Sequence, residues 1–283
     1  MQPHVQRGAG RARPALATRR AAAAWLWLGL SLLLPSAAHA ALPDEIQVYT
    51  DAINQPGESG MELHVNTTPK GQNRADYPGE VTTHHGLRVT PEFSYGLTPT
   101  LEAGLYLPSS FNAGNWTLAG IKARIKWLPL QPQKSSATGA ATGPFAGVNL
   151  EVSNIAPKFE AARHNAELRF MLGYRTHDWL FAFNPVFGWA LSASQEVPPA
   201  RNPKFRTGWK VAREISEGIS VGAEYYNDKG TWRNFDPGSQ QSKTLYAVLD
   251  VEKGPVPFNL GIGRGVNGQT DPWTIKAIFG FTF

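Results

Sequence analysis

The chain has 283 residues, with 27 lysines and arginines against 22 acidic residues and a formal net charge of +5. All of the surplus cations lie in residues 1–40, which contain no acidic residue, so residues 41–283 are formally neutral and give no basis for nucleic-acid binding. Because the chain has no cysteine, disulfide scaffolds, thiolate metal sites and cysteine nucleophiles are excluded.

Residues 1–40 have the pattern of a secretory signal peptide. Five arginines precede an apolar run at 21–34, and Ala38-His39-Ala40 fits a cleavage site before Ala41. We expect residues 41–59 to form an N-terminal periplasmic segment, although Glu45–Thr50 has a strand-like pattern. Counted as a strand, that piece would make the total odd and place the two chain ends on opposite sides, whereas we expect both ends to be periplasmic.

Residues 60–283 contain twelve segments in which apolar and polar side chains alternate, separated by clusters of Gly, Pro, Asn, Asp and Ser. Successive side chains of a strand point to opposite faces, so each segment predicts a strand with one apolar face. Long and short connections alternate between them, which is typical of outer-membrane barrels. The predicted strands are 60–67, 84–96, 100–108, 117–127, 144–153, 164–175, 179–190, 204–213, 219–227, 243–251, 257–265 and 272–283.

The fold class predicted is therefore all-β, a transmembrane antiparallel up-and-down barrel of about twelve strands; a soluble β-sandwich is the alternative. Two features depart from a regular barrel. The connection at 128–143 is long where a short turn is expected. Pro91 and Pro185 fall within predicted strands, where a missing N–H predicts a bulge or an end of regular pairing.

Aromatic residues predict the two membrane interfaces. Trp179 and Trp189 are on one face of a strand and ten residues apart, as are Trp273 and Phe283 in the last strand. At ~3.3 Å rise per residue and ~40° tilt, ten residues cover about 25 Å of membrane height. We expect these four residues to form an aromatic girdle in contact with outer-membrane lipid.

Charged residues predict the lumen wall. The candidates lie on the polar faces of five strands: Lys122, Arg124, Lys126, Glu102, Glu151, Glu167, Arg169, Arg206 and Lys210. One interpretation is a pore whose charged wall selects solutes. The other is a structural network in which Lys126 pairs with Glu102 and Lys122 with Glu151, because buried charges need partners.

An apolar stripe interrupts this charged wall. It consists of Leu180, Val186, Tyr246 and Val248. The stripe suits a lumen for small amphipathic or aromatic solutes. Alternatively, it packs against an inserted loop or against Glu45–Thr50.

We expect no catalytic residue, metal or cofactor. A membrane hydrolase needs a histidine and a serine close together, and none of the histidines after the signal peptide has a serine two positions later. The adjacent His84 and His85 would point to opposite faces of a strand and make a poor chelate. The histidines of residues 41–283 are interpreted as interfacial or loop residues.

The runs at Pro56–Asn66 (PGESGMELHVN) and Glu92–Thr98 (EFSYGLT) resemble proteobacterial outer-membrane barrels of the family named for the putative MetA pathway of phenol degradation. The resemblance implies a link to uptake of aromatic compounds. It also implies that the barrel-assembly machinery recognises Phe279, Phe281 and Phe283. The leading function is a passive channel or facilitator for small solutes, aromatic or anionic among them. A non-conducting barrel with a structural or loop-mediated binding role comes second, and an outer-membrane hydrolase third.

Overall fold

The computed structural model describes residues 42–112, 114–134, 141–193 and 201–283, so the predicted signal peptide and its cleavage site lie outside the described residues. These residues form an antiparallel, all-β structure without helices. None of them belongs to a helix that is long and apolar enough to cross a membrane.

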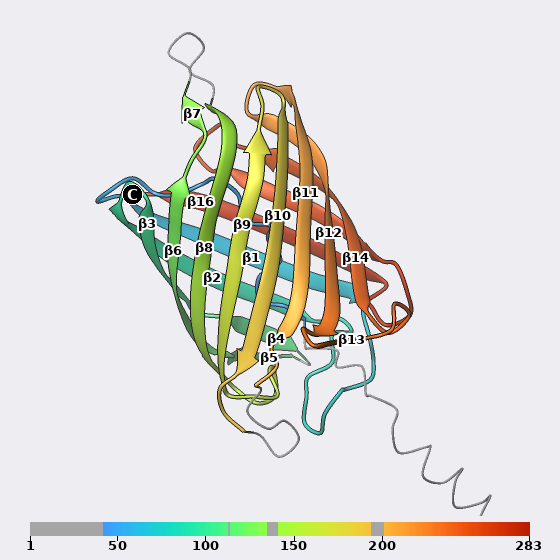
Figure 1. Cartoon of the computed structure of the whole chain (residues 1–283). Helices are drawn as coiled ribbons and strands as arrows, with labels where there is room; N and C mark the ends of the chain where they lie inside the picture. Colours follow the sequence, from blue (N-terminus) through green and yellow to red (C-terminus); the bar gives the residue numbers. More distant parts are fainter. Residues whose placement is uncertain (1–41, 113, 135–140, 194–200) are drawn as a thin grey trace, which may run out of the picture. The chain divides into compact units, whose positions relative to one another are not determined.

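Sixteen strand segments form a closed barrel of twelve strands, which confirms the predicted fold class (Figure 1). Segments β3 and β4 both pair with β2 and form one interrupted strand, and β5 and β6 form the next. β7 and β13 are two-residue extensions beside β8 and β12. The segments are β1 (Ser59–Lys70), β2 (Leu87–Thr98), β3 (Leu101–Tyr106), β4 (Ser109–Asn112), β5 (Asn115–Leu118), β6 (Gly120–Leu130), β7 (Gln133–Lys134), β8 (Ala141–Ile155), β9 (His164–Arg175), β10 (Trp179–Ala190), β11 (Lys204–Ser216), β12 (Ile219–Thr231), β13 (Asn234–Phe235), β14 (Ser242–Val251), β15 (Phe258–Gly265) and β16 (Trp273–Thr282).

Each of the twelve predicted strands corresponds to one barrel strand, and the barrel closes where β1 pairs with β16 in the register Met61↔Phe281. The two prolines mark interruptions. Pro91 accepts a hydrogen bond from the Leu107 N–H, in the break between β3 and β4. Pairing of β10 with β9 is interrupted at Asn184 and Pro185 and resumes at Val186 without a change of register.

The two ends of the barrel differ in their connections. One end, here called the turn end, carries short links such as 176–178 and 217–218, and also the C-terminus, because the Phe283 N–H donates to Ser59 O. The opposite end, the loop end, carries longer links such as 71–86 and 232–241. The predicted long connection at 128–143 is partly accounted for by longer strands, and residues 135–140 of it lie outside the described part.

The outward face of the barrel is apolar. On β6, Ile121, Ile125 and Trp127 are exposed and alternate with buried cations. Of the predicted girdle, Trp179, Trp273 and Phe283 are exposed and Trp189 is half-buried. Phe279 and Phe281 are half-buried beside the exposed Phe283. Such a surface suits a hydrocarbon environment with aromatic residues near its edges.

Residues 42–58, here called the lumen segment, differ from the prediction because they run inside the barrel and not in the periplasm. Asn66, near the loop end of β1, donates to Pro43 O and Asp44 O, whereas the Gly57 N–H donates to Gly96 O at the turn end. The segment therefore traverses the lumen before β1 begins. The first described residues lie at the loop end, opposite the C-terminus, and not at the same end as expected.

Candidate functional site

The lumen beside β1, β2, β3 and β6 holds a compact network of buried charges. The Arg124 guanidinium donates to Glu92 (Nε–Oε1, 2.7 Å) and to Glu102 (Nη2–Oε1, 2.7 Å), and Lys126 Nζ lies 3.0 Å from Glu102. The Lys126–Glu102 pair was predicted, and its residues are cross-strand partners in the sheet. Each carboxylate is thus balanced by cations, as buried charges require.

A second set of charges continues the network on β6, β8, β9 and β11. Lys122 Nζ lies 3.3 Å from Glu151, the other predicted pair. Glu167 accepts from Arg169 at 2.9 Å and from Arg206 at 2.5 Å. Together with Lys210, which belongs to the third group below, all nine predicted lumen charges face the interior. The structural-network interpretation explains their pairing.

A third group lies on β11, β12, β14 and β16, on the other side of the lumen. Glu224 accepts from Lys276 at 2.6 Å and lies 3.3 Å from Lys210, which also donates to Asp250 at 2.8 Å. Lys276 is completely buried, although the sequence analysis did not select it. Its position on the polar face of the last strand was the available signal.

The wall binds the backbone of the lumen segment through side chains. Asn184 accepts from the Tyr49 N–H (2.6 Å) and donates to Tyr49 O (3.0 Å), so one amide satisfies both backbone groups. Arg169 donates to Gln47 O and Lys276 donates to Ile46 O, each at 3.0 Å. These contacts explain how an extended segment lies in the lumen without a partner strand.

The apolar stripe is covered by the lumen segment. Ile46 packs against Tyr246 and Val248. Val48 packs against Phe145 and Ala182, with Leu180 alongside, and Val186 is also buried. The alternative in which the stripe packs against Glu45–Thr50 is therefore the one found.

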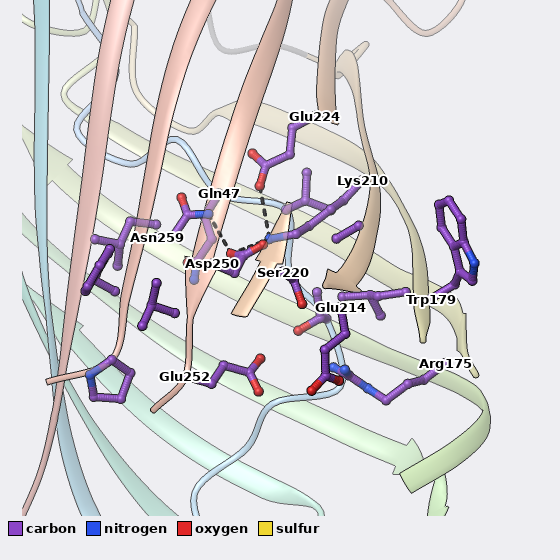
Figure 2. Close-up of a pocket in the computed structure, with 18 of the residues that line it drawn as sticks. Gln47, Arg175, Trp179, Lys210, Glu214, Ser220, Glu224, Asp250, Glu252 and Asn259 are labelled. Atoms are coloured by element: carbon purple, nitrogen blue, oxygen red, sulfur yellow. Dashed lines mark hydrogen bonds and ion pairs between the residues drawn. The ribbon is translucent and has the colours of Figure 1, made fainter. Parts of the chain in front are cut away.

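Two cavities open on either side of this contact. The cavity at the turn end has a volume of about 190 Å³, and Arg175, Lys210, Glu214 and Asp250 line it together with Gln47 (Figure 2). In that view Lys210 bridges Glu224 and Asp250 across the cavity wall.

The cavity at the loop end has a volume of about 230 Å³. Arg169, Arg206 and Asp228 line it, again with Gln47. Between the two cavities, Ile46 meets Tyr246 while its carbonyl oxygen accepts from Lys276. The lumen segment thus lies between the two cavities, near the middle of the lumen.

Glu62, His64 and Glu92 form the one group of histidine and acidic side chains, among the described residues searched, whose ligand atoms all lie within 4.8 Å of one another. His64 Nε2 lies 3.1 Å from Glu92, whose other oxygen accepts from Arg124. Because Arg124 already neutralises Glu92, the group fits the ion network. His64 is fully buried, so its interpretation as an interfacial or loop residue was wrong. The available signal was its position two residues after Glu62, on the same face of β1.

The fold is that of outer-membrane barrels of known structure. An outer membrane channel from Pseudomonas putida F1 superposes with a TM-score of 0.54 at 10% identity, covering 84% of this chain and 100% of that one. The NanC porin superposes with a TM-score of 0.51 at 10% identity, covering 78% and 98%. No protein-family model matches the chain, and no curated protein matches its sequence. The likeness therefore shows the architecture of an outer-membrane barrel, and the MetA-pathway family itself has no such support.

Proposed function

We propose that the protein is a passive outer-membrane channel for small solutes, held closed in this structure by the lumen segment. The observation that carries the proposal is the pair of cavities that approach each other from opposite ends, with Gln47 lining both. Only the layer around Ile46 and Val48 separates them. The architecture shared with a protein described as an outer membrane channel supports the same function.

Charge favours anionic solutes over aromatic ones. The apolar stripe expected to contact aromatic solutes is occupied by Ile46 and Val48. Lys122, Arg169 and Arg175 line successive levels of the path that the lumen segment now fills, and cations on a pore wall favour anions. Aromatic carboxylates carry both an aromatic ring and a negative charge, so the resemblance to the MetA-pathway barrels includes them among the candidate solutes.

Planar bilayers test the proposal. We expect the full chain to conduct in small, infrequent steps, and a variant lacking residues 42–53 to conduct in larger, sustained steps. Correct folding of the variant is checked by heat-modifiable mobility in gel electrophoresis. A folded deletion variant that never conducts would contradict a channel. It would favour the second candidate, a non-conducting barrel, which the occupied lumen also supports.

A further inference from the structure

The lumen segment is a strip of negative charge in a cationic barrel. Residues 42–58 contain four acidic residues, Asp44, Glu45, Asp51 and Glu58, and no lysine or arginine. Since residues 41–283 are neutral with 22 charges of each sign, residues 59–283 have 18 acidic residues against 22 cations, an excess of +4. The segment therefore supplies the negative charge that makes residues 41–283 neutral.

Three of the four acidic residues meet wall cations along the path. Asp44 lies 3.0 Å from Lys122 Nζ near the loop end, and Glu45 lies 3.6 Å from Arg169. Toward the turn end, Asp51 accepts two hydrogen bonds from Arg175, at 2.7 and 2.9 Å. Charge-assisted, bidentate hydrogen bonds such as the Asp51–Arg175 pair are stronger than hydrogen bonds between neutral groups.

The wall also recognises the peptide backbone between these charges. Asn184 binds both the N–H and the C=O of Tyr49, while Arg169 binds the carbonyl of Gln47 and Lys276 that of Ile46. Asn66 binds the carbonyls of Pro43 and Asp44. The donors and acceptors are side chains of barrel strands, so they stay on the wall when the segment leaves.

We propose that the lumen is a binding track for extended acidic peptides, and that residues 42–53 occupy it as an internal competitor. The proposal rests on the channel function proposed above, and it names the class of ligand. Backbone recognition by Asn184 favours a peptide over an acidic sugar chain, because a sugar offers no N–H and C=O on adjacent positions of an extended backbone. A tethered competitor acts at an effective concentration of about millimolar, so an external peptide binds weakly to the intact chain.

Titration calorimetry in detergent tests the track with the variant lacking residues 42–53. The probe is a synthetic peptide of the deleted sequence, LPDEIQVYTDAI. The control peptide replaces its acids as D44N, E45Q and D51N. We expect the acidic peptide to bind at least tenfold more tightly than the neutral one, and to block conductance of the variant in planar bilayers with the same preference.

A second variant guards against misfolding of the deletion. The full chain with D44N, E45Q and D51N keeps every backbone contact of the lumen segment but loses its charge pairs. We expect it to admit the acidic peptide at least tenfold more readily than the unmodified chain. Glu58→Gln is the matched control, because Glu58 accepts from the Gln55 N–H near the turn end and contacts no lumen cation in the described structure. It should bind the peptide no better than the unmodified chain.

The outcomes separate the two proposals. Binding of the peptide to a variant that never conducts would contradict the channel and leave the track intact. Conductance without binding, or equal binding of the acidic and neutral peptides, would overturn the track and leave the channel intact. Tighter binding of a linear uronic-acid trisaccharide than of the peptide would also overturn the assignment to peptides.

Discussion

Replacing Asn184 by alanine should release the lumen segment without disturbing the barrel. Asn184 is 1% exposed, and its amide makes both of its hydrogen bonds to the backbone of Tyr49. A net loss of about 1–2 kcal/mol for each buried hydrogen bond gives about 2–4 kcal/mol for the two. At about 1.4 kcal/mol per factor of ten, the docking equilibrium should shift toward the released state by about 30- to 700-fold.

Hydrogen exchange followed by mass spectrometry measures this shift. Peptides covering 42–58 should lose protection by that factor, while peptides from β10 and β11 keep theirs. Asn149→Ala is the matched control, because Asn149 is also buried in the barrel wall but its amide has no hydrogen-bond partner in the described structure. Unchanged protection in the Asn184 variant, or an equal loss in the Asn149 variant, would refute the reasoning.

Three further predictions follow from single contacts. Asp51→Asn should raise exchange in the lumen segment by about tenfold, because a partly exposed charge-assisted pair contributes about 1–2 kcal/mol. Arg124→Met should lower the free energy of unfolding in urea by about 3–5 kcal/mol because it removes the guanidinium that neutralises the buried Glu92, and Glu92→Gln added to it should restore part of the loss. The hydrogen bond to Asp178 raises the pKa of His177, so this contact stabilises the turn fully below the unfolded pKa and is lost as the pH rises through the folded one. In NMR titration, Asp178→Asn should lower the pKa of His177 toward its ordinary value, and an unchanged pKa would contradict the assignment.

The strands could be predicted from sequence because a barrel wall imposes one rule on each residue. Side chains face lipid or lumen alternately, so Lys122, Arg124 and Lys126 are assigned to the lumen by parity alone. Antiparallel neighbours then place Glu102 opposite Lys126. The interruption at Pro91 was predictable for the same reason, since proline lacks the N–H that the ladder uses.

The path of the lumen segment could not be predicted in this way. Glu45–Thr50 alternates like a strand, but its backbone is satisfied by side chains far away in sequence, such as Asn184, which is 135 residues from Tyr49. No periodicity records such a contact. Asn184 was noticeable only as the one polar residue on an otherwise apolar lumen face of β10.

The interior course of the lumen segment changes how reporters of topology must be interpreted. Twelve strands alone would bring both chain ends to the same side, but the additional pass by residues 42–58 adds a crossing. An epitope inserted just before Leu42 and one appended after Phe283 would then label opposite faces of the membrane. If release of the segment withdraws it toward the turn end, the two labels would become accessible from one face, so surface labelling of intact cells would distinguish the docked from the released state.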